Sequence, residues 1–231
     1  MRLIVATTVA TTLALTALLA AADLDEQGKR LDEAATVLSQ IMTAPDNGLP
    51  HDLLQTAHCI VIVPDFKSGA LGIGGKYGKG YVSCRNKGGA GWSAPGAVRI
   101  EGGSIGRQIG ASSTNLIMLV MTERGAERLL SSEFKLGAEG SVAAGPVGRT
   151  VTAQTDVQLH ADILSWSKSQ ELFAGFAVEG ATLHEDLDDN TTLYGHKLQN
   201  REIVTSGVPA PATAARLLAL LNTYSARERT N

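Results

Sequence analysis

The sequence contains few cysteines and little net charge, and each shortage excludes a class of protein. Two cysteines in 231 residues cannot support a disulfide-dense scaffold or a zinc site made of cysteine alone. The 20 basic residues are offset by 23 acidic ones, so the chain lacks the basic surface that general nucleic-acid binding requires. Its five histidines do not have the spacing of metal ligands, and neither a metal nor another cofactor is expected. The length allows one domain or two small ones.

Long apolar runs are also scarce, and the one of membrane-spanning length stands at the N-terminus. Met1 and Arg2 form a short basic start, residues 3–19 are apolar or Thr, and Ala20–Ala22 supply small residues before Asp23. This order is typical of a secretory signal peptide over residues 1–22, cleaved after Ala22. A membrane anchor of similar length is the alternative. We therefore expect an exported mature protein, either periplasmic or secreted.

Helical periodicity follows the signal segment and returns near the C-terminus. Apolar residues recur at helical spacing over residues 24–42, with Asp23 as a candidate N-cap. The charges of this first helix sum to −3, whereas helices that lie on membranes are usually basic, so we expect it to pack on a core. Shorter helices are expected at 50–57 and 188–194, and a C-terminal helix at 211–226 after a linker at 206–209.

Glycine is plentiful, and the centre of the chain has the pattern of β-structure. Of 25 glycines, 14 fall within residues 69–110, where they indicate bends, bulges and close backbone approaches. Residues 59–63 predict a buried strand that ends at Pro64. Further strands are expected at Gly80–Arg85, Ala97–Glu101 and Asn115–Met121.

The clearest alternation of apolar and polar residues lies on both sides of Gly145-Pro146. It predicts a two-stranded ribbon over residues 134–144 and 147–163, followed by a central strand over Leu172–Val178. The fold class is therefore α+β, with a twisted antiparallel sheet that could close like a barrel and with helices at both ends of the chain.

Three motif matches suggest chemistry but lack the structural context that the chemistry needs. Residues 102–106 fit the G-x-S-x-G elbow of serine hydrolases, but glycines occupy the place of the helix that should follow Ser104. An exported serine hydrolase is thus only a remote alternative. Residues 72–80 are rich in glycine but do not match a phosphate loop, so a hairpin is favoured. The acidic segment 184–189 lacks EF-hand spacing, and a solvated loop is favoured over a calcium site.

The two cysteines are expected to form a disulfide. Cys59 opens the first strand and Cys84 lies near the end of another, and the glycine-rich hairpin between them can bring these strands together. An oxidising compartment favours pairing. Two free buried thiols are the alternative.

Basic residues gather in the glycine-rich segment. Between residues 64 and 110 only Asp65 and Glu101 oppose seven basic residues, which gives a local charge of +5. These seven are candidate ligand-binding residues, because glycine neighbours let a phosphate approach the backbone closely. A solvated charged face is the alternative. The candidates are Lys67, Lys76, Lys79, Arg85, Lys87, Arg99 and Arg107.

Several ordered motifs together resemble one known family. Four segments are similar to the SYLF domain, a family also named for a Las17-binding actin regulator of yeast. They are the run from Cys59 to Pro64 followed by glycines up to Gly80, the string from Gly102 to Gly110, the segment Leu172–Phe176 and the ending Asn190–Gly195. The resemblance covers about residues 24–195. It divides the chain into a signal peptide (1–22), a SYLF-like domain (23–196) and a linker with a C-terminal helix (197–231).

The resemblance implies a non-enzymatic lipid-binding module. Eukaryotic members bind phosphoinositides, partly through a basic amphipathic N-terminal helix, and some bundle actin. The first helix of this chain is acidic and no SH3 segment follows the domain in this sequence, so actin binding is not supported. We expect the partner to be anionic lipid or a membrane surface. A structural or protein-interaction role in the envelope without a lipid ligand is the alternative.

Overall fold

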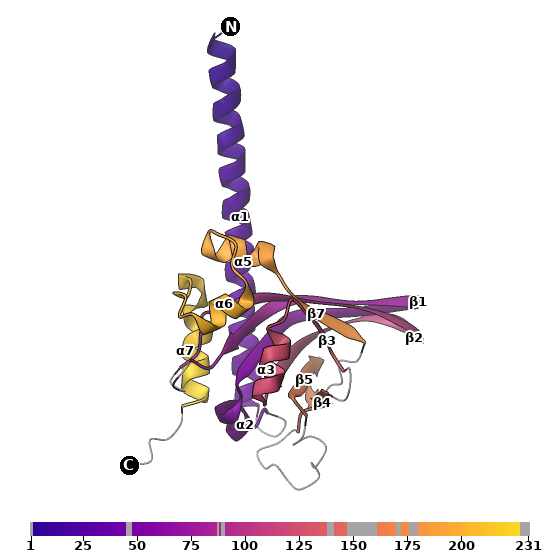
Figure 1. Ribbon diagram of the computed structural model, residues 1–231. Helices are drawn as coiled ribbons and strands as arrows, with labels where there is room; N and C mark the ends of the chain where they lie inside the picture. The colour runs from indigo at the N-terminus through magenta and orange to yellow at the C-terminus, as the bar shows by residue number, and fades with distance from the viewer. Residues whose placement is uncertain are drawn as a thin grey trace.

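The computed structural model describes residues 2–44, 48–86, 88, 91–137, 141–146, 161–169, 172–175 and 180–226. Its first element is one long helix, α1 (Arg2–Thr43). The N-terminal half of α1 projects from the body of the protein and the second half packs on it (Figure 1). The expected N-cap at Asp23 is wrong, because the Ala-rich residues before it continue the helix without a break.

Two very long strands, β1 (Cys59–Cys84) and β2 (Gly96–Val120), form the centre of the sheet. They pair antiparallel from Cys59 opposite Val120 to Val82 opposite Gly96. The expectation that Pro64 ends the first strand is wrong. The register shifts between Val63 and Phe66, and such a bulge accepts a proline because an unpaired residue needs no N–H.

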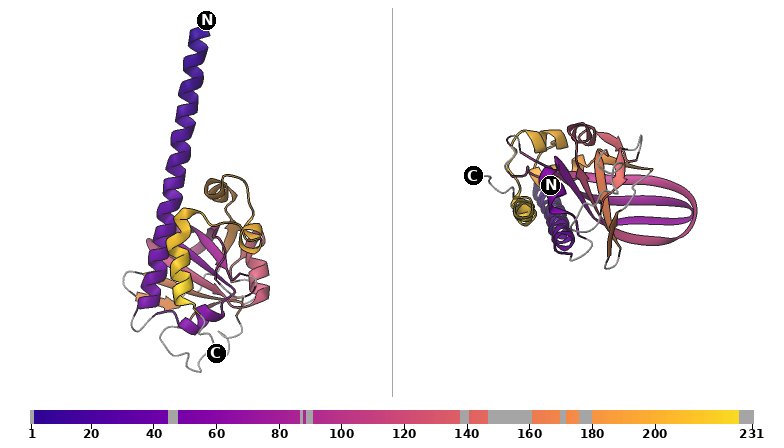
Figure 2. Two further views of the ribbon diagram at one scale, coloured as in Figure 1. Left: turned by 90° about the vertical axis from the view of Figure 1, so that its left-hand side faces the viewer. Right: turned by 90° about the horizontal axis from the view of Figure 1, so that it is seen from below.

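Strand β1 turns back on itself. Its two ends meet in a disulfide between Cys59 and Cys84, whose Cα atoms are 3.9 Å apart. The halves of β1 touch at Gly80, where an added Cβ would lie 2.1 Å from the carbonyl oxygen of Ile62. Residues 66–80 of β1 and 98–114 of β2, here called the β-arm, begin at the hydrophobic core and run sideways out of the body, where they fold over (Figures 1 and 2).

The other strands extend the sheet on both sides of β2. They are β3 (Glu133–Lys135), β4 (Val142–Ala144), β5 (Ile163–Ser169), β6 (Leu172–Gly175) and β7 (Ala181–Glu185). The seven strands follow the order β3-β7-β2-β5-β4, with β1 paired to β2 and β6 paired to β5. Described pairs are antiparallel except β4 with β5, which is parallel.

That parallel pair differs from the ribbon expected across Gly145-Pro146. An antiparallel partner could follow β4 directly, but the described strand beside β4 is β5, which runs in the same direction. Residues 147–160, the expected second strand of the ribbon, lie outside the described residues. The strand expected over Leu172–Val178 is described only as β6, and within the described chain β6 pairs with β5 alone.

The remaining helices cover the sheet. They are α2 (His51–Thr56), α3 (Glu123–Leu129), α5 (Leu187–Tyr194), α6 (Asn200–Thr205) and α7 (Ala215–Tyr224), with a 3₁₀ turn η2 (Ala212–Ala214) before α7. Helices α2, α5 and α7 lie at the expected positions, whereas α3 and α6 were not predicted. Helix α5 ends at Gly195, whose φ of 75° lies in the left-handed region that glycine adopts without strain.

Both faces of the β1–β2 pair are buried, each against its own hydrophobic core. Ile60, Ile62 and Tyr81 face α1 and α7, while the alternate residues Val61 and Val63 face the core beneath α6. This arrangement confirms the α+β class with a twisted sheet between helices. Helices α6 and α7 contribute buried residues to the two cores, and the domain boundary at residue 196 stays a prediction.

Candidate functional site

The seven candidate basic residues do not form one patch. Strand alternation places Lys76 and Lys79 on opposite faces of β1. Arg99 lies directly across from Lys79 on β2 and shares its face. Lys87 lies outside the described residues, as does the side chain of Arg107, although the backbone of Arg107 belongs to β2.

Lys79 is held in a polar network that joins three elements. Its ammonium lies 2.9 Å from Asp186 and 3.0 Å from Asp189, which belongs to helix α5. Asp189 also accepts a hydrogen bond of 2.7 Å from Arg30 of α1. The hydroxyl of Tyr81 donates to Gln27 of α1 at 2.7 Å. The network connects α1, β1 and α5, so Lys79 has a structural role in addition to any role in binding.

The buried position of Asp186 is stabilised by this network. Burial alone would raise the pKa of its carboxyl group, because desolvation disfavours the charged form. The hydrogen bonds from Lys79 and from the backbone N–H of Asp189 outweigh burial and lower the pKa below its usual value. The carboxylate of Asp186 also accepts the N–H of Asp189 as the N-cap of α5. The basic side chains of Lys79 and Arg30 therefore hold this segment in an ordered position, whereas the sequence predicts a solvated loop.

Arg85 is also a structural residue. Its guanidinium donates to the carbonyls of Leu54 and Gln55 at the end of α2 and to that of Ser225 at the end of α7, at 3.0, 3.2 and 3.4 Å. It also lies 4.3 Å from the centre of the Trp92 ring. Arg85 therefore joins two helix C-termini to the sheet.

The remaining described candidates, Lys67, Lys76 and Arg99, lie on the β-arm. Lys67 is exposed and is 3.2 Å from Asp65. Arg99 is 2.9 Å from Glu101. Exposed pairs of this kind are worth only about 0–1 kcal/mol, so both cations can exchange partners. Lys76 is half-buried.

The other two sequence expectations at this site have different outcomes. The disulfide between Cys59 and Cys84 is confirmed, and both residues are buried. The backbone of Ser104 lies inside β2 opposite Gly74, which is not the strand-to-helix turn of a nucleophile elbow. The side chain of Ser104 and the partners Asp156 and His160 lie outside the described residues. Within the described chain, no three His, Cys, Asp or Glu side chains are grouped as metal ligands.

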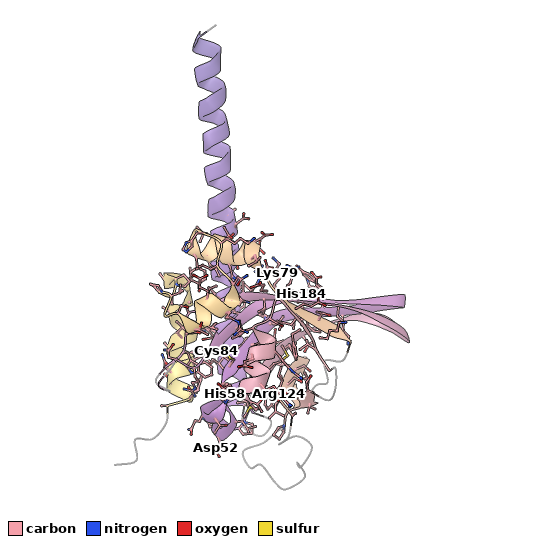
Figure 3. All side chains as sticks on the ribbon, in the orientation of Figure 1. Asp52, His58, Lys79, Cys84, Arg124 and His184 are labelled. Atoms are coloured by element: carbon pink, nitrogen blue, oxygen red, sulfur yellow. A yellow bond between two sulfur atoms is a disulfide. The ribbon has the colours of Figure 1, made fainter. Side chains whose placement is uncertain are left out.

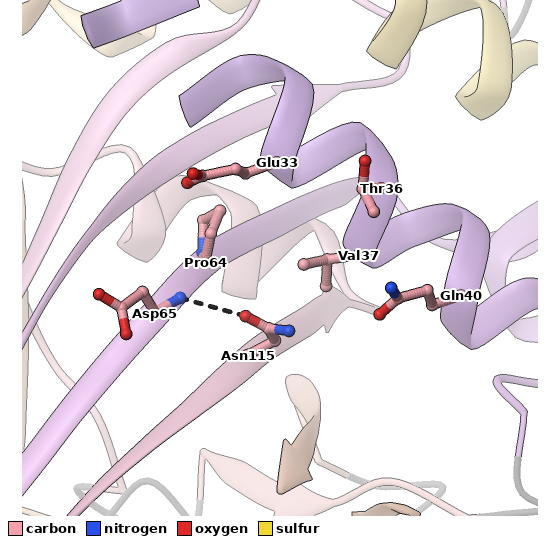
Figure 4. A pocket seen from close by; sticks show the side chains of 7 residues that line it. All are labelled: Glu33, Thr36, Val37, Gln40, Pro64, Asp65 and Asn115. Atoms are coloured by element: carbon pink, nitrogen blue, oxygen red, sulfur yellow. Dashed lines mark hydrogen bonds between the residues drawn. The ribbon is translucent and has the colours of Figure 1, made fainter. Parts of the chain in front are cut away.

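A groove that no sequence pattern predicted lies between α1 and β1. Two cavities of about 300 and 290 Å³ share Glu33, Pro64 and Asp65 in their walls. The first is also lined by Thr36, Val37, Gln40 and Asn115, and Figure 4 shows these side chains facing one another across it. The second is also lined by Glu26, Arg30, Lys67, Tyr77, Gly78 and Lys79.

The bulge after Val63 shapes this groove. Asp65 adopts a φ of 51°, which is uncommon for a residue with a side chain. Its backbone N–H donates to the amide oxygen of Asn115 at 3.1 Å, and its carboxylate accepts from Ser113. The hydrogen bond from Ser113 is the main cause of a pKa below the usual value for Asp65. A charged carboxylate is therefore fixed at the groove wall.

The sequence of the chain matches one family model in the comparisons with known proteins. The family model described as "Las17-binding protein actin regulator", Ysc84, matches residues 101–224, which is more than half of the chain. The chain belongs to the Ysc84 (SYLF) family. The match runs from the β-arm to the end of α7 and so includes both helices beyond residue 196.

Curated SYLF proteins from animals and yeast are similar over most of this chain. "SH3 domain-containing YSC84-like protein 1" of Rattus norvegicus is 30% identical over 187 residues, covering 80% of this chain and 54% of the relative. "Protein YSC84" of Saccharomyces cerevisiae is 32% identical over 181 residues, covering 76% and 38%. "LAS seventeen-binding protein 3" of the same species is also 32% identical over 181 residues, covering 76% and 39%. The chain thus spans about half or less of the length of these relatives.

In the part of the chain whose side chains the structure describes, which begins at residue 22 in α1, no helix is both long enough and apolar enough to cross a bilayer.

Proposed function

We propose that this SYLF protein is a non-enzymatic binding module that docks its β-arm on anionic lipid, such as an anionic phospholipid or a phosphoinositide-like head group. The observation that carries the proposal is the charge of the β-arm. Its two segments contain five basic residues and one acidic residue, in a chain whose net charge is −3. The basic residues of the β-arm are Lys67, Lys76, Lys79, Arg99 and Arg107.

The shape of the β-arm supports this assignment. It extends from the body of the protein, where it can reach a flat surface before the rest of the molecule does (Figure 1). Gly75 and Gly103 have no atom within 4 Å of the place where a Cβ would stand, so the backbone is open to a phosphate there. Each Lys or Arg near an anionic membrane surface contributes about 1 kcal/mol of attraction.

A binding role without catalysis agrees with the names of the relatives, which describe binding and regulation. It also agrees with the backbone of Ser104, which lies within a strand. We infer that the protein acts outside the cytoplasm after cleavage near Ala22. Gln27 is the first buried residue among those described in α1, so this cleavage removes no described core residue.

Co-sedimentation with vesicles tests the lipid proposal. The chain from Asp23 onward should sediment with vesicles that contain phosphatidylglycerol and remain in the supernatant with pure phosphatidylcholine at physiological salt. Lys67→Glu with Lys76→Glu should reduce sedimentation by about tenfold or more, because reversing two charges lowers the net charge of the β-arm by four units. Lys79 is left unchanged, because its loss would break the network with Asp186.

The control reverses two exposed cations at and before α6, Lys197 and Arg201. Lys197→Glu with Arg201→Glu makes the same change in net charge and should sediment like the unaltered protein. Equal loss in both double variants would show that only net charge matters, and unchanged sedimentation of the β-arm variant would refute the proposed surface.

A protein-interaction role without lipid is the second candidate. It is favoured by the family description, which names a protein, Las17, as the partner of its members. Failure to bind any vesicle, with retention of a folded domain, would support this second role.

A further inference from the structure

We propose that the groove between α1 and β1 binds the zwitterionic head group of a glycerophospholipid, in which an ammonium is joined to a phosphate diester. Phosphoethanolamine and phosphocholine are the head groups of this class. The site is lined by Glu33, Pro64 and Asp65 at its centre and is separate from the face of Lys76 on the β-arm.

The charge balance of the groove selects a zwitterion. Its charged lining residues are three carboxylates and three cations, so their formal charges cancel. A purely anionic ligand would be repelled by the three carboxylates, and a purely cationic ligand would be repelled by the three cations. A ligand with both charges can satisfy both sets at once. The residues are Glu26, Glu33 and Asp65 against Arg30, Lys67 and Lys79.

Glu33 and Tyr77 form the part of the lining that suits an ammonium. Glu33 is exposed, and no ion-pair partner is found for it among the described residues. Tyr77 lines the same cavity with 47% of its surface exposed, although the other large apolar side chains that are described on β1 are buried. An aromatic face beside a carboxylate is the usual means of binding a substituted ammonium.

Lys67 and Lys79 form the part that suits a phosphate. Among the described residues, the ion-pair partner of Lys67 is Asp65, and a ligand can replace this exposed pair at little cost. Lys79 is held by Asp186 and Asp189, and an ammonium has three N–H donors, so one donor remains for a ligand oxygen. The head group would therefore lie along the cavity with its phosphate toward β1.

The cavity that Val37 lines offers uncharged hydrogen-bond donors, which the ester groups of a glycerophospholipid require. The amide oxygen of Asn115 accepts from the backbone of Asp65, and that of Gln40 accepts from Lys168 at 2.9 Å. Both amides thereby keep their NH₂ groups as donors beside Val37 (Figure 4). The size of about 290–300 Å³ for each cavity is at the lower end of known ligand sites, so the groove suits the head group and glycerol but not whole acyl chains.

A titration of the chain from Asp23 onward tests the proposal. Soluble phosphocholine and phosphoethanolamine should shift the NMR signals of groove residues at millimolar concentration, and inorganic phosphate should not. Glu33→Gln should weaken this binding by about fivefold or more, and Tyr77→Ala by about threefold. A sedimentation arm uses pure phosphatidylcholine or phosphatidylethanolamine vesicles at millimolar lipid, where weak head-group binding becomes measurable. Sedimentation there shows that the groove binds the head group in a membrane, and its absence shows that the groove binds only the free head group.

The matched control is Glu202→Gln, which removes an exposed carboxylate from α6. It should bind like the unaltered protein, and circular dichroism checks the folding of all variants. Shifts by inorganic phosphate equal to those by phosphocholine, or unaltered binding in Glu33→Gln, would overturn the proposal. Sedimentation with phosphatidylglycerol should not change in Glu33→Gln, so failure of the groove and failure of the β-arm are distinguishable.

Discussion

At the residue scale, the main finding is that long-range partners decide what a basic side chain does. Lys79 and Arg85 are candidates by composition alone, yet both hold structure together. The ammonium of Lys79 bonds a carboxylate 110 residues away in the sequence, and the guanidinium of Arg85 bonds a carbonyl 140 residues away. Lys67 and Arg99 remain on the surface and are the better candidates for reversible contacts.

Arg85 should be required for stability. Arg85→Ala removes donors to three carbonyls and a contact with Trp92, so we expect the free energy of unfolding to fall by about 2–3 kcal/mol. Arg85→Lys should recover only part of this loss, because a single ammonium cannot match the fork of a guanidinium. Urea unfolding followed by tryptophan fluorescence measures both. Arg99→Ala, an exposed control, should change stability by less than about 0.5 kcal/mol.

Asp186 should make stability depend on acid pH. Its pKa in the folded protein is below the usual value near 3.8, so its contribution to stability is complete above about pH 4 and is lost as pH falls through the lower folded pKa. Asp186→Asn should therefore show a smaller decrease in unfolding free energy between pH 5 and about pH 2 than the unaltered protein. Parallel curves for the two proteins, measured by denaturant unfolding, would contradict this.

At the element scale, the decisive feature is that β1 doubles back. The two halves of β1 approach so closely that Gly78 and Gly80 have no room for a Cβ, and Cys59 meets Cys84. The glycines of this strand therefore allow the two backbone segments to pack in direct contact, as a glycine inside a strand often does.

Gly80 should not tolerate a side chain. Gly80→Ala places a Cβ 2.1 Å from the carbonyl oxygen of Ile62, which the backbone can relieve only by separating the halves of β1. We expect a loss of about 3 kcal/mol or more, or failure to fold. Gly75→Ala on the same strand has no atom within 4 Å of the new Cβ and should be close to neutral. Thermal melts followed by circular dichroism compare the two.

The disulfide should stabilise the same fold-back. It closes a loop with a sequence separation of 25, which is worth roughly 3.5 kcal/mol in the chain-entropy model. Cys59→Ala with Cys84→Ala should lower the unfolding midpoint while vesicle binding is retained, because the bond supports the scaffold and is buried. A variant with an unchanged midpoint would show that the cores alone hold the halves of β1 together.

At the scale of the whole molecule, α1 divides into a projecting half and a docked half. The docked half packs against β1, α5 and α7, with Leu31, Leu38 and Ile41 fully buried. The projecting half, which contains the predicted signal peptide, and the docked half thus belong to one continuous helix (Figure 1).

The chain from Asp23 onward should fold without the first 22 residues. The first buried residue described in α1 is Gln27, so we expect the melting temperature and the hydrogen-exchange protection of Leu31–Ile41 to be those of the full-length chain. A second truncation that begins at Asp32 removes Gln27, Arg30 and Leu31 from the network and core and should be markedly less stable. Equal stability of both truncations would show that the start of the docked half contributes little.

The sequence by itself determined the α+β class, the helices at both ends, the pairing of its two cysteines and its family, because these depend on local periodicity, glycine content and ordered motifs. Only the tertiary structure decided the course of β1 past Pro64, the parallel pair of β4 and β5, and the partners of Lys79 and Arg85. The physical reason is that strand pairing and ion pairing join residues far apart in the chain. A local pattern shows that a lysine is charged and that a strand is half-buried, but not which carboxylate or which strand will lie beside it.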